Sequence, residues 1–206
     1  MHSHPAKRLV LFAKAPRLGL VKTRLARTLG DSKALEAYQV LADATLASIA
    51  GFQDVTVQFS PDDALQEIQS WLRPGWRTAP QGSGDLGERL ARCFAQQLQP
   101  APSRVVVIGS DCPDVSSMDV EAAWRLLETH DLVLGPALDG GYWLIGLNQT
   151  QPSLFSGIDW STPRVLEQTL ARADLRKLKT STLRPLEDVD TPEDWKKFLH
   201  RRSSKD

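Results

Sequence analysis

The 206-residue chain contains only two cysteines and four histidines. Cys93 and Cys112 cannot form the disulfide framework of a small secreted scaffold, and such low cysteine use favours a reducing compartment. The histidines, none of them close to Cys112 in sequence, argue against a zinc centre and against a cysteine nucleophile. The apolar runs, for example residues 9–13 and 105–109, are far shorter than the ~20 residues of a membrane helix. We therefore expect a cytoplasmic protein with no signal peptide and no membrane span.

Acidic residues are missing from the first 30 positions, although the whole chain carries 25 acidic and 25 basic side chains. A basic segment in a neutral protein predicts a local anion site rather than a nucleic-acid surface, with a solvated basic end as the alternative. The hydrophobic share of 41% is ordinary for a globular domain and excludes a disordered tail protein.

Short apolar runs alternate with helical stretches, which predicts a single α/β domain over residues 1–206. We expect a mostly parallel, open, Rossmann-like sheet with helices on both faces, and ligands beyond the carboxyl ends of its strands. The expected strands are residues 8–13, 54–60, 76–79, 104–109, 131–134, 142–147 and 175–183. Two of the expected helices span residues 32–50 and 118–129. A third begins at Ser60-Pro61 and ends near residue 72, and a fourth ends near residue 99. The last two begin at Thr162-Pro163 and at Thr191-Pro192.

The first expected strand runs into a basic loop that carries Lys14 and then Lys22, Thr23 and Arg24 at the start of a helix. Backbone N–H groups at a helix start, with cationic side chains beside them, suit a di- or triphosphate. The loop lacks the GxxxxGK[ST] pattern of a Walker loop, and a charged surface loop is the alternative interpretation.

Acidic residues follow two of the expected strands. Asp111 comes directly after the most β-branched strand, and Pro113 restricts the loop that holds it. A carboxylate there can present oxygen atoms to Mg²⁺ or Mn²⁺, although a structural strand cap would use the same residue. Five acids lie within residues 187–194; some would stabilise the start of the last helix, and one could be a second metal ligand.

Two glycine-rich segments allow both functional and ordinary interpretations. Asp139, Gly140, Gly141 and Tyr142 would let backbone and an aromatic face approach a sugar or base, but an Asp-Gly hairpin turn explains the same letters. Residues 82–87 match GxGxxG; the weak strand before them and the missing acid about 20 residues later disfavour a dinucleotide-dependent dehydrogenase.

Five ordered motifs between about residues 8 and 197 carry a family resemblance: FAKAPRLGLVKTRL, QGSGDLGER, GSDCPD, GPALDGGYWLIGL and DVDTPED. Together they resemble bacterial GT-A-fold glycosyltransferases of the selenodomain-associated and arsenosugar-biosynthesis group. More distantly, VKTRL resembles the phosphate loop of phospholactate guanylyltransferases. Asp111-x-Pro113 and DVDTPED resemble the metal-site segments of molybdenum-cofactor guanylyltransferases.

The resemblance implies a nucleotide-diphospho-sugar transferase fold that uses Mg²⁺ or Mn²⁺. By matching position, it implies phosphate contacts for Lys14, Lys22 and Arg24, and metal binding for Asp111 with Asp190 as a second acid. It also implies an acceptor or sugar pocket at Asp139, Gly140 and Gly141. Gln81 and Asp85 would lie near the nucleoside.

The reaction class follows from the same motifs, with one departure. Glycosyltransferases of this fold commonly carry Asp-x-Asp, whereas Asp111-Cys112-Pro113-Asp114 is closer to the nucleotidylyltransferases. We expect a glycosyltransferase that takes a nucleotide sugar and a small-molecule acceptor, with Asp139 as the catalytic base. Two alternatives stay open: a nucleotidylyltransferase that takes a nucleoside triphosphate and releases pyrophosphate, and a nucleotide-binding protein without turnover.

Overall fold

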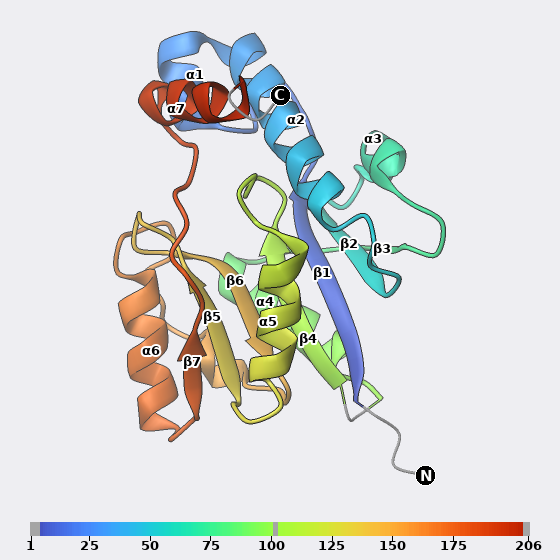
Figure 1. The fold of residues 1–206 in the computed structure, drawn as a ribbon, viewed down its shortest axis with the longest axis vertical. Helices are drawn as coiled ribbons and strands as arrows, with labels where there is room; N and C mark the ends of the chain where they lie inside the picture. The colour runs from blue at the N-terminus through green and yellow to red at the C-terminus, as the bar shows by residue number, and fades with distance from the viewer. Residues whose placement is uncertain (1–4, 101–102, 204–206) are drawn as a thin grey trace.

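The computed structural model describes residues 5–100 and 103–203. Its strands are β1 (Ala6–Lys14), β2 (Val55–Ser60), β3 (Arg77–Pro80), β4 (Ser103–Gly109), β5 (Leu132–Pro136), β6 (Tyr142–Leu147) and β7 (Thr180–Thr182). They form one sheet in the order β3-β2-β1-β4-β6-β5-β7 (Figure 1). Neighbouring strands are parallel except at β6, which runs antiparallel to both β4 and β5.

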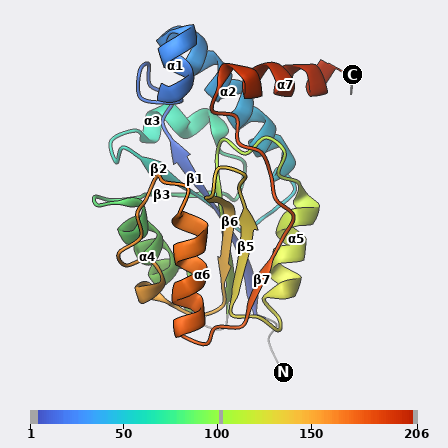
Figure 2. The same ribbon diagram turned by 90° about the vertical axis from the view of Figure 1, so that its left-hand side faces the viewer.

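Helices cover both faces of this sheet. They are α1 (Thr23–Leu29), α2 (Asp31–Ser48), α3 (Leu65–Ile68), α4 (Leu86–Gln97), α5 (Ser117–Leu126), α6 (Val165–Leu175) and α7 (Pro192–Ser203), with 3₁₀ turns η1 (Gln69–Trp71) and η2 (Pro152–Leu154). Figure 2 shows α4 and α6 on one side of the sheet and α5 on the other. The expected α/β class, with a mostly parallel sheet between two helical layers, is confirmed.

The alternation of side chains along β1 divides the hydrophobic core in two. Leu9 and Leu11 are fully buried in a cluster with residues of α2 and α5, among them Trp124. Val10 points to the other face, where it belongs to a cluster with α4 residues such as Phe94. Because successive strand residues point to opposite faces, an uninterrupted apolar run is what a strand buried on both sides requires. None of the helices in the described part of the chain has the length and hydropathy to cross a bilayer.

Two expected elements are wrong in their extent. Ser60 does not begin a helix; it ends β2, where it pairs with Lys14 and its carbonyl accepts a hydrogen bond from Ala15. The sheet thus uses the backbone of Ser60, and only the short α3 and η1 follow. The expected strand at residues 175–183 is reduced to β7, because α6 continues to Leu175 and the chain then turns through Lys177, whose φ is 55°.

The remaining differences are small. The basic loop does end in a helix, but α1 is a separate element, and Gly30, with a φ of 83°, joins it to α2. The last helix begins as expected at Pro192, after a capping box in which Thr191 and Asp194 exchange hydrogen bonds.

The strand order fixes where a ligand can bind. The chain places β2 and β3 successively on one side of β1 and then returns to place β4 on the other side. Ligands of open α/β sheets bind beyond the carboxyl ends of the strands at such a reversal. A ligand site is therefore expected in the crevice between the ends of β1 and β4.

Candidate functional site

Lys22 is the centre of a charged cluster beyond the ends of β1 and β4. Its side chain is only 5% exposed, and its Nζ lies 2.8 Å from Asp111 Oδ2 and 3.1 Å from Asp190 Oδ1. Arg24 Nη1 contacts the other oxygen of Asp190 at 3.2 Å. Lys22 adopts a φ of 46° immediately before α1, and this left-handed backbone is uncommon for a non-glycine residue. The cluster joins three segments that are far apart in sequence.

Electrostatic coupling within this cluster is strong. Burial alone would lower the pKa of Lys22, but Asp111 and Asp190 raise it well above its usual value. Burial opposes ionisation of Asp111, yet the ammonium group of Lys22 holds the pKa of Asp111 below its usual range. Both groups are therefore charged at neutral pH.

Asp188 is a further member of the acidic group, and the sequence analysis did not single it out. Burial, together with the nearby charges of Asp139 and Asp111, raises its pKa to about 7. The five acids at residues 187–194 were the available signal, but the sequence alone favoured Asp190 because of its position in DVDTPED. Asp188 thus adds a further, partly buried acid close to Asp111 and Lys22.

The pKa of Asp188 leads to a pH-dependent prediction. Its carboxyl group faces the negative charges of Asp139, Asp111 and Asp190 and the positive charge of Lys22. The folded pKa exceeds the unfolded value, so the folded state binds more protons and the contribution of Asp188 to stability falls as pH rises from about 4 to about 7. Asp188→Asn removes this loss. Urea unfolding should therefore show a gain in stability over the wild type that grows across this pH window and is constant above it. A pH-independent difference would contradict the assignment.

Tyr38 connects the two strand ends that flank the crevice. Its hydroxyl donates a hydrogen bond to the carbonyl oxygen of Lys14 at 2.7 Å and lies 2.7 Å from Ser110 Oγ. Lys14 ends β1, and Ser110 follows β4. Tyr38 is 2% exposed, and burial raises the pKa of its hydroxyl well above the usual value. It therefore acts as a neutral hydrogen-bonding link that sets Lys14 relative to Asp111.

Two cavities open on this edge of the sheet. The first, of about 510 Å³, brings together Lys14, Gln81, Asp85 and Asp111. The second, of about 520 Å³, is lined by Arg24, Asp139, Gly141, Tyr142 and Asp190 among others. Most of the residues expected to act thus fall into two adjacent groups. The exceptions are Lys22, Thr23 and Gly140, which line neither cavity.

Several of these side chains already have structural partners. The amide nitrogen of Gln81 donates to the carbonyl oxygens of Ala13 and Gln58, and its oxygen accepts from Arg89. Asp85 is the N-cap of α4 in a capping box with Glu88. The carboxylate of Asp139 accepts a hydrogen bond from Gly141 N at 2.9 Å, which is the contact of an Asp-Gly turn. These bonds fix the walls of the cavities.

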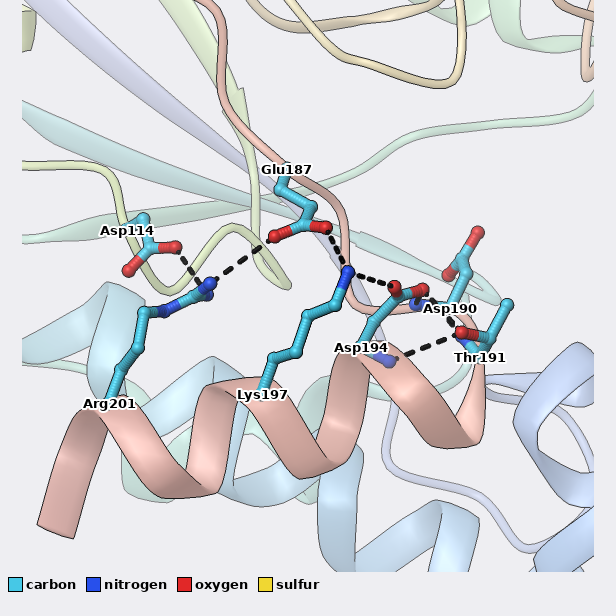
Figure 3. Close-up of polar contacts among 7 residues, drawn as sticks. All are labelled: Asp114, Glu187, Asp190, Thr191, Asp194, Lys197 and Arg201. Atoms are coloured by element: carbon cyan, nitrogen blue, oxygen red, sulfur yellow. Dashed lines mark hydrogen bonds and ion pairs between the residues drawn. The ribbon is translucent and has the colours of Figure 1, made fainter.

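Helix α7 anchors the acidic loop that precedes it (Figure 3). Arg201 contacts Asp114, three residues beyond Asp111, at 2.9 Å and Glu187, next to Asp188, at 3.2 Å. Lys197 forms a second bond to Glu187 at 2.9 Å. The helix therefore joins the loop after β4 to the loop after β7, and it holds the acids of the two loops in a fixed relation.

The donor atoms of the charged cluster bear on whether it can hold a metal ion. Within residues 5–100 and 103–203, no three His, Cys, Asp or Glu side chains are already placed to hold a metal ion. The ammonium group of Lys22 lies instead between Asp111 and Asp190. The donors are nevertheless all carboxylate oxygens, which suit Mg²⁺ or Mn²⁺. The residues fit a divalent cation chemically. Cys112 is buried, and burial and Asp111 raise its pKa, so it has no thiolate character.

Comparison with known proteins defines the class. The fold is that of the nucleotidyltransferases and GT-A-like transferases, with the strand-end crevice in which we find the charged cluster. The chain belongs to the family DUF2064, described as uncharacterized protein conserved in bacteria, whose model matches residues 44–162. No curated protein matches the sequence.

Three solved structures illustrate the range of similarity. A candidate nucleotide-diphospho-sugar transferase from Desulfovibrio desulfuricans G20 is 33% identical, with a TM-score of 0.84 over 91% of this chain and 84% of the other. CMP:2-keto-3-deoxy-manno-octonic acid synthetase, complexed with CTP, is 13% identical, with a TM-score of 0.58 over 97% and 99%. Rv0371c from Mycobacterium tuberculosis H37Rv, in complex with manganese, is 15% identical, with a TM-score of 0.54 over 95% and 98%. The last two share the fold alone.

Proposed function

We propose that this protein is a metal-dependent glycosyltransferase that takes a nucleotide-diphosphate sugar and a small-molecule acceptor. The observation that carries the proposal is the pair of adjacent cavities at the strand-end crevice, one with Lys14 and Asp111 and the other with Asp139. Two cavities of similar size suit a donor and an acceptor that must meet. Similarity to the Desulfovibrio protein supports the choice of a nucleotide-sugar donor.

The first cavity has the charges that a nucleoside diphosphate requires. Lys14 and Arg89 supply cations, and Asp111 in the wall of this cavity would hold Mg²⁺ or Mn²⁺ together with the neighbouring Asp188 and with Asp190, which lines the second cavity. A bound cation would neutralise the charge that builds on the diphosphate as it leaves. Arg24, 58% exposed at the start of α1, lines the second cavity and would contact the same phosphates by turning away from Asp190. Such cationic groups act by stabilising the leaving group in the transition state.

The second cavity would bind the acceptor. In the proposed step an acceptor hydroxyl attacks the anomeric carbon, the bond from that carbon to the diphosphate breaks, and Asp139 accepts the hydroxyl proton. The backbone N–H of Gly141 holds one oxygen of Asp139 and so orients the carboxylate. Gly140 contributes differently: a side chain there would collide with Pro163, so we assign it to loop packing rather than to ligand contact.

Nucleotidylyl transfer is the second candidate. The similarity to a synthetase complexed with CTP and the Asp111-Cys112-Pro113-Asp114 segment favour it. In that reaction the same cations would stabilise pyrophosphate instead of a nucleoside diphosphate.

A product assay distinguishes the candidates. The protein is incubated with Mg²⁺ or Mn²⁺ and with panels of nucleotide sugars and nucleoside triphosphates, with water and simple sugars as acceptors. Release of a nucleoside diphosphate is expected. Release of pyrophosphate would instead establish the second candidate, and binding without turnover would leave a nucleotide-binding protein.

In the same assay Arg24→Ala should weaken nucleotide affinity about tenfold, because it removes an exposed charge-assisted contact. Arg27→Ala, an exposed arginine on the same helix, is the matched control.

A further inference from the structure

Trp160 lies at the boundary between the two cavities. It lines both of them, together with Leu86 and Ser161. The GxGxxG match and the Asp-Gly-Gly segment each contain a glycine, Gly87 and Gly140, that the proposed reaction does not use and that packs against the loop carrying Trp160.

Gly87 in α4 provides the space that the indole occupies. A Cβ atom at this position would lie 2.7 Å from Trp160 Nε1 and 2.6 Å from the carbonyl oxygen of Phe155. Any larger residue would therefore displace the indole or the backbone behind it. This is the third glycine of the GxGxxG match, so here that glycine serves close packing against Trp160.

Gly140 holds the other end of the same loop. Its φ is 90°, and a Cβ atom there would overlap the backbone of Pro163. The carbonyl oxygen of Gly140 also accepts a hydrogen bond from Leu166 N at 2.9 Å. The β5–β6 turn and α4 thus both pack against the loop that carries Trp160.

The backbone between these two contacts is strained. Ser161 has a φ of 63°, a left-handed conformation that is uncommon for a residue other than glycine. Bonds from Thr162, Arg164 and Gln168 to Asp159 fix the turn that contains it. Backbone strain of this kind persists where the surroundings over-determine it, and it is often found at ligand sites.

We propose that Trp160 binds the donor by stacking on the sugar ring of the nucleotide sugar. This inference rests on the proposed function. If the nucleoside diphosphate occupies the cavity with Lys14 and the acceptor the cavity with Asp139, the transferred sugar must lie where the cavities meet. The flat indole at that boundary suits the apolar face of a sugar ring. The packing of Gly87 and Gly140 against the Trp160 loop keeps the indole in place.

Calorimetry with two ligands tests this role. A nucleoside diphosphate and the corresponding nucleotide sugar are titrated, with Mn²⁺, into the wild type, Trp160→Phe and Trp160→Leu. Trp160→Leu removes the aromatic face and should weaken nucleotide-sugar binding about tenfold relative to nucleoside-diphosphate binding. Trp160→Phe should keep most of the wild-type ratio. Trp76→Phe is the control for loss of a tryptophan, because Trp76 directly precedes β3, away from the carboxyl ends of the strands. Thermal unfolding confirms that each variant is folded.

The other outcomes are distinct. An equal loss of both ligands in Trp160→Leu would assign the indole to the nucleotide and overturn the inference. Unchanged affinity for both ligands would show that the indole only fills space, with the same consequence. Failure of the wild type to bind either ligand would instead refute the proposed function, and the inference with it.

Discussion

Asp111→Asn is expected to abolish metal-dependent binding of a nucleoside diphosphate and to reduce turnover by at least about a hundredfold. Asparagine keeps the shape of the side chain but lacks the negative charge that holds a divalent cation. Replacement of the outer partners of metal ligands already costs about ten- to a hundredfold, so a direct ligand should cost more. Calorimetric titration with and without Mg²⁺, alongside the product assay, measures both effects.

The stability of this variant separates a metal ligand from a structural strand cap. Removing the charge of Asp111 weakens its contact with Lys22 but also relieves its repulsion of Asp188, so the melting temperature should change by only a few degrees. Asp54→Asn is a matched control, because Asp54 is similarly exposed and ion-paired but lies at the opposite edge of the sheet. A large loss of stability with metal-dependent binding intact would make Asp111 structural.

Lys22→Met is expected to destabilise the protein by about 2 kcal/mol at pH 8. Methionine fills a similar volume without the charge, and it leaves Asp111 and Asp190 without their shared cation. Removing one partner from a fully buried pair costs about 3–5 kcal/mol, and the effect here is smaller because both carboxylates keep contact with water. Lys33→Met, an exposed lysine in the first turn of α2, is the control.

The destabilisation caused by Lys22→Met should depend on pH and on Mg²⁺. The carboxylates depend on the ammonium group only when they are ionised, so the destabilisation should shrink as pH falls from 8 towards 4. Mg²⁺ should restore more stability to Lys22→Met than to the wild type, because a bound cation can replace the missing ammonium charge. Urea unfolding at several pH values, with and without Mg²⁺, measures these differences. A loss that does not vary with pH or Mg²⁺ would contradict the electrostatic role of Lys22.

Much of the site could be located from the sequence because parallel strands end at one edge of a sheet. Lys14 and Asp111 each follow an apolar run, and that alone places Lys14 at the carboxyl end of β1 and Asp111 just beyond that of β4. The sequence could not show that Lys22 would pair with both Asp111 and Asp190, because the three residues meet only after the sheet and α7 have formed. Asp188 was missed for a related reason: its raised pKa comes from burial and from Asp139 and Asp111, which are distant in sequence.

The sequence by itself determined the fold class, the strand-end location of the charged residues and the positions of most helices. These features depend on local patterns: apolar runs for buried strands, capping residues for helix starts and glycine where the backbone turns. Only the tertiary structure decided which acid faces which cation, and that Gly87 and Gly140 pack against the Trp160 loop. Packing and electrostatic contacts between distant segments depend on distances across the folded chain, and a linear pattern does not contain those distances.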